Sequence, residues 1–231
     1  MVDLNDKRIR VIVGHYGSGK TEFSVNYVLK LAEQGKKTAL VDLDIANPYF
    51  RSRERRQLLE GKGIQVFSNA FGYDITADLP AITARIKAPL EDESFQTVVD
   101  AGGNDSGARI LNQFGKYLSG PDCDLLCVIN ANRPETDSVA GALNHIRRIE
   151  AETNLRMTGL VNNTHMLKET STEDILKGYE LCQELSQKLA VPVRYHCCLE
   201  EIWKNIGINL RELCEGSLFL MKSYMRDSWQ S

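Results

Sequence analysis

Short apolar runs alternate with longer amphipathic stretches along the whole chain. The short runs are almost continuously Val, Ile or Leu, which is typical of strands covered on both faces in a parallel sheet. This pattern predicts strands at residues 9–13, 38–41, 65–67, 97–99, 125–129, 158–161 and 191–195.

The stretches between these runs carry apolar residues at helical spacing. The first begins inside a glycine-rich loop and stops at Gly35, a residue type that often ends a helix. Ser171 and Thr172 precede a later one and are suitable N-caps. Helices are predicted at residues 21–34, 78–87, 108–118, 135–152, 173–189 and 209–226.

This alternation predicts an α/β fold, a doubly wound, mostly parallel sheet of about seven strands with helices on both faces. No internal repeat or Pro/Ser-rich linker interrupts residues 1–231, so we expect a single domain. In segment 209–226, apolar residues recur at helical spacing and would form a stripe along one side of a helix, which predicts a helix packed on the sheet. A membrane-surface helix would need more basic residues than Arg211, Lys222 and Arg226 supply.

Composition narrows the function classes. Of 231 residues, 42% are hydrophobic and 26% charged, with a net charge of -3, which excludes a generally basic nucleic-acid binder and a disordered acidic chain. The N-terminus lacks the pattern of a secretory signal, and no run approaches the roughly 18 apolar residues of a membrane span. We therefore expect a cytoplasmic protein.

Six cysteines are present without a C-x-x-C motif, so reduced thiols are expected. Cys197 and Cys198 are adjacent, and adjacent side chains on an extended backbone point in opposite directions. One of them would bind a metal only together with ligands from elsewhere in the chain.

The strongest motif is GHYGSGKT at residues 14–21, which fits G-x-x-x-x-G-K-[ST] completely. It follows a predicted strand and opens a predicted helix. Glycines let the backbone curl so that its N–H groups face phosphate oxygens, and the helix adds its positive end. Lys20 is expected to reach the β- and γ-phosphates, and the Thr21 hydroxyl to ligate magnesium.

Two acidic segments accompany this loop. In VVDAGG, Asp100 ends a strand and is expected in the magnesium shell, while the N–H of Gly103 would contact the γ-phosphate and make residues 101–107 a switch segment. In VDLDIANP, Asp42 and Asp44 leave the end of another strand, where open α/β sheets bind ligands. The alternatives are a capping aspartate at Asp100 and two solvated turn aspartates at Asp42 and Asp44.

Together these pieces resemble the SIMIBI class of P-loop NTPases, and within it the MinD/ParA-like ATPases. The resemblance covers GHYGSGKTE, VDLDIANP, VVDAGG, NANRPET and GLVNN in the family's order. It implies that Asp44 orients the attacking water, that Asp42 and Asp100 serve the metal, and that Asn162 or Asn163 reads adenine. The absence of N-K-x-D favours ATP over GTP.

These assignments give one candidate site for ATP/ADP and Mg²⁺. The candidate catalytic residues are Lys20, Asp44 and Asp100. The candidate metal ligands are Thr21, Asp42 and Asp100. The candidate nucleotide-binding residues are Gly14, His15, Tyr16, Gly17, Ser18, Gly19, Lys20, Thr21, Glu22, Gly103, Asn162 and Asn163.

The sequence departs from the family at His15, where partitioning and arsenite-pump relatives carry a lysine that reaches a dimer partner's phosphate. An arginine acting in trans is one substitute, and four follow the Asp44 segment: Arg51, Arg53, Arg55 and Arg56. The alternatives for these arginines are a solvated basic helix face or a nucleic-acid patch, although no interleaved aromatic residues suggest stacking on bases.

Three functions fit the sequence. The leading hypothesis is a nucleotide-driven ATPase switch that acts on a protein partner, with a nucleotide-dependent homodimer as one possible form. The second is a small-molecule kinase or ATP-dependent ligase, with an acceptor pocket formed by His15, Tyr16, Asn47, Tyr49, Arg51 and Arg109. The third is a module that holds nucleotide without chemistry.

Overall fold

The computed structural model describes residues 4–43, 55–68, 79–103, 105–206 and 208–225. Within them, eight strands form one sheet in which every neighbouring pair is parallel. The strands are β1 (Ile9–Val13), β2 (Thr38–Asp42), β3 (Gln65–Ser68), β4 (Gln96–Asp100), β5 (Cys123–Ile129), β6 (Gly159–Asn162), β7 (Val193–Leu199) and β8 (Leu218–Met221).

The strand order is β3-β2-β4-β1-β5-β6-β7-β8. The chain first builds outward from β1 to β3, then inserts β4 between β2 and β1, and adds β5 to β8 on the other side. Strand β1 therefore lies between β4 and β5, and Ile12 pairs in register with Asp100 and with Leu126. This reversal of direction beside β1 is where open α/β sheets bind ligands, at the carboxyl ends of the strands.

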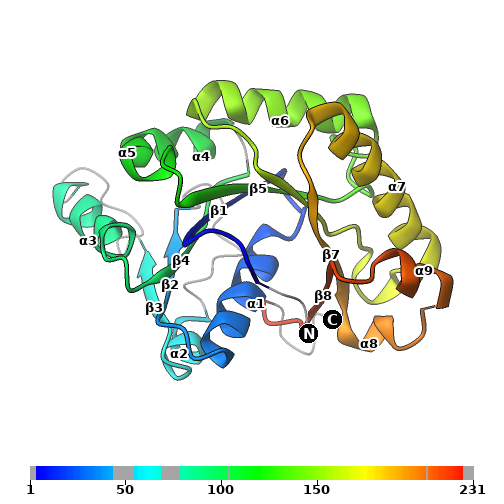
Figure 1. Ribbon diagram of the computed structural model, residues 1–231, viewed down its shortest axis with the longest axis horizontal. Helices are drawn as coiled ribbons and strands as arrows, with labels where there is room; N and C mark the ends of the chain where they lie inside the picture. Colours follow the sequence, from blue (N-terminus) through cyan, green and yellow to red (C-terminus); the bar gives the residue numbers. More distant parts are fainter. Residues whose placement is uncertain (1–3, 44–54, 69–78, 104, 207, 226–231) are drawn as a thin grey trace.

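Both faces of the sheet are covered, which explains the continuous apolar runs. In β5, Leu125, Cys127 and Ile129 belong to one buried cluster, whereas Leu126 and Val128 belong to a second. Successive side chains of a strand point to opposite faces, so both sets are buried only if helices cover both sides. Figure 1 shows helix α1 (Lys20–Glu33) on the opposite side of the sheet from helix α6 (Val139–Thr153).

The helix that begins at Thr172 has Ser171, one of the two N-cap candidates in the sequence, as its N-cap. Ser171 forms a capping box with Asp174, because its hydroxyl accepts from the Asp174 N–H at 3.2 Å and its own N–H donates to the Asp174 carboxylate at 2.9 Å. The α-helices are α1 (Lys20–Glu33), α2 (Arg56–Glu60), α3 (Leu79–Glu91), α4 (Asp105–Arg109), α5 (Gly115–Leu118), α6 (Val139–Thr153), α7 (Thr172–Leu189), α8 (Glu200–Trp203) and α9 (Ile208–Leu213). The 3-10 helices are η2 (Ile110–Phe114) and η3 (Leu167–Glu169).

The predicted C-terminal helix is wrong over most of its length. Helix α9 ends at Leu213, Gly216 adopts a left-handed φ of 82°, and β8 follows as an additional strand beside β7. Phe219 and Met221 are buried while Leu218 and Leu220 are partly exposed, which is the alternation of a strand. The apolar stripe assigned to one helix therefore combined a short helix with a strand.

Two other predicted helices differ in detail. Segment 108–118 divides into α4, η2 and α5. The helix expected from residue 135 begins at Val139, because residues 130–136 form turns in which the Arg133 N–H donates to the Asn130 carbonyl at 3.1 Å. Among the described helices, none is both long and apolar enough to cross a membrane.

Candidate nucleotide-binding site

The glycine-rich loop at residues 14–19 joins β1 to α1, and Lys20 is the first residue of that helix. Lys20 and Thr21 are buried, with 6% and 8% of their surfaces exposed. Gly19 has a left-handed φ of 84°, and a Cβ added there would lie 2.3 Å from the Asn163 Nδ2. Glycine is required at this position both for its backbone conformation and for this close approach.

The VVDAGG segment lies directly against this loop. Strand β4 neighbours β1, and the Ala101 N–H donates to the Ile12 carbonyl at 3.1 Å. A Cβ added at Gly103 would lie 2.7 Å from the Lys20 Nζ and 2.9 Å from the Gly14 carbonyl oxygen. The fold therefore brings the second motif next to the first, as neighbouring strands require.

Asp42 and Asp100 end adjacent strands and are register partners in the β2–β4 pairing. Register partners project to the same face of a sheet, with their strands about 4.8 Å apart. Both residues are buried, with 4% and 0% of their surfaces exposed. The structure thus places two carboxylates side by side at the carboxyl edge of the sheet, next to the strand that leads into the loop.

The two candidate asparagines have different surroundings. The Asn162 side chain bonds within the fold: its Nδ2 lies 3.1 Å from the His196 Nδ1, and its Oδ1 accepts from the Thr164 hydroxyl at 2.8 Å. The Asn163 Nδ2 donates to the Ser18 carbonyl at 2.8 Å. Asn163 lines the cavity beside the loop, and Asn162 does not.

A cavity of about 230 Å³ begins at the glycine-rich loop. Tyr16, Lys20 and Thr21 lie at the loop, and the segments after β5 and β6 contribute Arg133 and residues 163–165. The remaining lining comes from η3, the end of β7, α8 and the C-terminal segment, and is mostly apolar. A polar end joined to an apolar end suits a ligand that carries phosphates on a flat aromatic base.

Cys197 and Cys198 line the cavity as buried thiols. Burial raises the pKa of both, to about 12 for Cys198, so these thiols are protonated near neutral pH. In the part of the chain that the structure describes, no group of three or more His, Cys, Asp or Glu residues is placed to hold a metal ion.

His15 and Glu22 contact other parts of the same chain. The His15 Nδ1 lies 3.6 Å from the Glu135 carboxylate, and the His15 ring meets the His145 ring edge-on at 5.4 Å. Glu22 lines the cavity, but its carboxylate accepts from the backbone N–H groups of Tyr224 and Met225. Glu22 therefore bonds the C-terminal segment.

Some of the predicted arginines also have structural partners. Arg109 forms an ion pair with Glu152 at 3.1 Å, and Arg56 donates to the Glu60 carboxylate and to the Val66 carbonyl. These contacts join Arg109, at the end of α4, to α6, and Arg56, at the start of α2, to β3. Five predicted positions lie outside the described residues: Asp44, Asn47, Tyr49, Arg51 and Arg53.

Sequence reasoning missed Arg133 as an individual residue of the site. Its Nε donates to the Gly17 carbonyl at 3.1 Å, and a Cβ added at Gly17 would lie 3.0 Å from the same nitrogen. The available signal was position, because Arg133 lies in a turn directly after the buried strand β5, at the ligand-binding edge of the sheet. The C-terminal lining residues had no such signal.

Comparison with known proteins agrees with this geometry. No family model matches the chain. The chain is 28% identical over 182 residues to the ATPase GET3C of Arabidopsis thaliana, an alignment that covers 75% of this chain and 43% of that protein. This chain thus spans less than half of the length of that relative.

Solved structures share the fold at lower identity. Chloroplast FtsY from Physcomitrella patens matches with a TM-score of 0.56 and 17% identity, over 84% of this chain and 59% of that one. The signal recognition particle 54 kDa protein from Aeropyrum pernix K1, solved in complex with GDP, matches with a TM-score of 0.54 and 20% identity, over 84% of this chain and 42% of that one. With the loop, the paired aspartates and the strand order, these likenesses show that the chain has the P-loop NTPase fold, resembles the SIMIBI class and is distantly similar in sequence to the ATPase GET3C.

Proposed function

We propose that this chain binds and hydrolyses Mg·ATP and that the nucleotide state switches its interaction with a protein partner. The observation that carries the proposal is the cavity that begins at Lys20 and Thr21 and continues toward an apolar end. Lys20 would contact the β- and γ-phosphates, and the N–H of Gly103, which lies against the Lys20 side chain, would contact the γ-phosphate.

The residues beside the loop fit a magnesium ion. Thr21, Asp42 and Asp100 offer only oxygen atoms, the ligand type that Mg²⁺ prefers. Two carboxylates on neighbouring strands repel each other, and a divalent cation beside them would offset that repulsion. When bound, the ion would neutralise charge on the β- and γ-phosphate oxygens. Asp42 and Asp100 would orient its water ligands, and Asp44 would position the attacking water.

The base would occupy the apolar end of the cavity. Asn163 is the better placed of the two candidate asparagines, because it lines the cavity and Asn162 does not. The Asn163 Nδ2 donates to the Ser18 carbonyl, whereas both the nitrogen and the oxygen of the Asn162 amide bond within the fold. An amide pairs with both the amino group and a ring nitrogen of adenine. The residues after β6, Asn-Thr-His, do not supply the aspartate that an N-K-x-D guanine site uses, which supports ATP.

Calorimetric titration with Mg·ATP, Mg·ADP and Mg·GTP tests the binding step. We expect both adenine nucleotides to bind and Mg·GTP to bind at least tenfold more weakly. Equal affinity for ATP and GTP would refute the base assignment. No heat of association with any of them, for folded protein, would refute the proposed function.

Affinity purification with Asp44→Ala in the presence of Mg·ATP tests the switch. Because Asp44 is proposed to position water and not to hold ATP, this variant should retain ATP and hydrolyse it slowly. A partner should then be retained with Mg·ATP and released with Mg·ADP. Hydrolysis at the wild-type rate would refute the role of Asp44, and transfer of phosphate to a small molecule would favour a kinase.

A further inference from the structure

The C-terminal segment at residues 221–225, here called the C-terminal strap, is bonded to the first two turns of α1. The Asn26 side chain makes two hydrogen bonds to the backbone of Lys222, accepting from its N–H at 2.8 Å and donating to its carbonyl at 2.9 Å. The Glu22 carboxylate accepts from the N–H groups of Tyr224 at 2.7 Å and Met225 at 3.1 Å. Four hydrogen bonds therefore fix the strap to the helix that begins at the phosphate loop.

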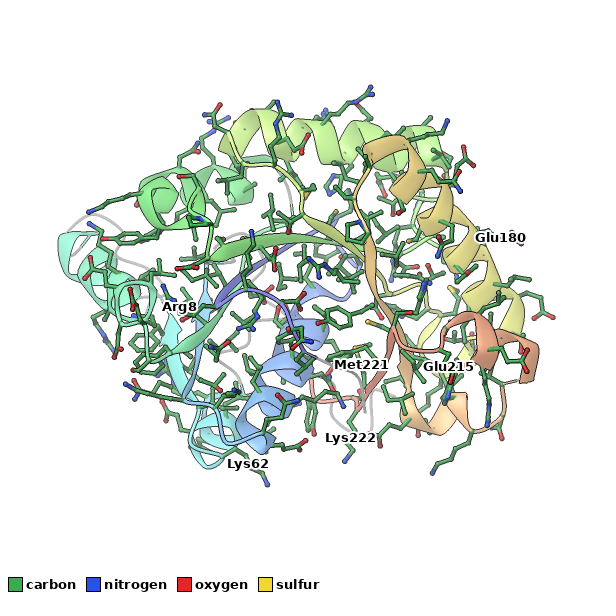
Figure 2. The ribbon with its side chains drawn as sticks, in the orientation of Figure 1. Arg8, Lys62, Glu180, Glu215, Met221 and Lys222 are labelled. Atoms are coloured by element: carbon green, nitrogen blue, oxygen red, sulfur yellow. The ribbon has the colours of Figure 1, made fainter. Side chains whose placement is uncertain are left out.

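Alternate residues of the strap line the cavity beside that loop. Met221, Ser223 and Met225 all contribute to its lining, whereas Lys222 and Tyr224 do not. Every second residue lines the cavity because the backbone is extended, so that successive side chains point to opposite sides. Figure 2 labels Met221 at the end of β8 and Lys222 immediately after it.

We propose that the C-terminal strap is a specificity-determining part of the nucleotide site, with Met221, Ser223 and Met225 contacting the nucleoside and not the phosphates. This inference rests on the proposed function, since it assigns the apolar end of the same cavity. The flexible, polarisable side chains of Met221 and Met225 suit contact with the face or edge of an aromatic base.

The attachment through Glu22 gives the strap a fixed position relative to the phosphates. Glu22 directly follows Thr21 in the first turn of α1, where the positive end of the helix stabilises a carboxylate. The strap and the phosphate loop are thus held by the same helical turn. A nucleoside in contact with the strap would lie at a set distance from Lys20.

Ser223→Phe tests the inference, and Lys222→Phe is its matched control. Both residues are exposed, so a new aromatic side chain is compatible with folding at either position, but only Ser223 lines the cavity. Calorimetry with Mg·ATP and with inorganic tripolyphosphate separates the nucleoside end from the phosphate end. We expect Ser223→Phe to lower the affinity for Mg·ATP at least tenfold and the affinity for tripolyphosphate less than twofold. Lys222→Phe should bind both ligands with an affinity close to that of the wild type.

Met225→Ala gives a second measurement, because it shortens a lining side chain and leaves the hydrogen bonds of the strap in place. We expect this substitution to lower the affinity for Mg·ATP three- to tenfold and to leave the affinity for tripolyphosphate unchanged. Wild-type affinity for Mg·ATP in both Ser223→Phe and Met225→Ala would overturn the role of the strap while the proposed function stands. A wild-type protein that binds neither ligand would overturn the proposed function itself.

Discussion

The backbone of Gly103 lies against the side chain of Lys20, so closely that a Cβ on Gly103 would fall 2.7 Å from the lysine Nζ. The same Cβ would lie 2.9 Å from the Gly14 carbonyl oxygen and 3.0 Å from the Tyr16 nitrogen. The lysine side chain could move aside, but the backbone atoms of Gly14 and Tyr16 could make room only if the loop changed its conformation. Position 103, three residues after the end of β4, therefore has space only for glycine while the glycine-rich loop keeps its conformation.

Gly103→Ala should accordingly weaken Mg·ATP binding by about 1–3 kcal/mol, the usual cost of adding a methyl group to a filled site. Calorimetry measures the affinity, and a phosphate-release assay measures turnover. Gly115→Ala is the matched control, because a Cβ there meets nothing within 4 Å. Equal affinity in the two variants would show that the Gly103 contact has no part in nucleotide binding.

Lys20→Ala should reduce the affinity for Mg·ATP by about 3 kcal/mol, roughly a hundredfold, because a charged donor to two phosphate oxygens is lost. Lys36→Ala removes an exposed lysine near the end of the same helix and should bind like wild type. Equilibrium binding of a fluorescent ATP analogue compares the two. A Lys20→Ala protein that keeps wild-type affinity would place the phosphates elsewhere.

Substitutions of the two asparagines should have different effects. Asn163→Ala should reduce the preference for ATP over GTP, because Asn163 lines the cavity. Asn162→Ala should instead lower the free energy of unfolding by about 1–3 kcal/mol, because His196 and Thr164 lose a buried partner. Thermal melts and competition titrations separate the two effects. Loss of base preference in Asn162→Ala alone would reverse these assignments.

His196 should make stability depend on pH in a mildly acidic range. Burial lowers its pKa from 6.5 to about 4, because the charged ring is poorly solvated between Asn162 and the Tyr179 ring. As the pH falls from about 6.5 to about 4, the unfolded chain takes up a proton that the folded chain does not. The free energy of unfolding should therefore fall by up to about 1.4 kcal/mol per pH unit.

His196→Asn is the comparison for that measurement, since its side-chain oxygen accepts from Asn162 and does not titrate. Urea unfolding at several pH values between 4 and 7.5 gives both curves. The wild-type curve should be steeper than the variant's over this range. Parallel curves would show that His196 is protonated equally easily in the folded chain.

The sequence located the glycine-rich loop, which is the proposed phosphate end of the site, because local rules are sufficient there. A glycine pattern, a preceding apolar strand and a following helix act within about a dozen residues, and the predicted strands proved parallel and covered on both faces. Local rules do not determine which residues of two strands lie side by side, because that depends on which strands pair in the folded sheet. The adjacency of Asp42 and Asp100 required β4 to enter between β2 and β1.

By itself, then, the sequence determined the fold class and the loop from Gly14 to Thr21, since apolar periodicity and glycine spacing are local properties of the chain. Only the tertiary structure decided which of Asn162 and Asn163 lines the cavity, and that the residues after Gly216 form a strand and a strap beside α1. The four apolar residues of β8 suit a helix or a strand, and pairing with β7 selects the strand. Contacts between residues about 200 positions apart, such as Glu22 with Tyr224, exist only once the chain has folded.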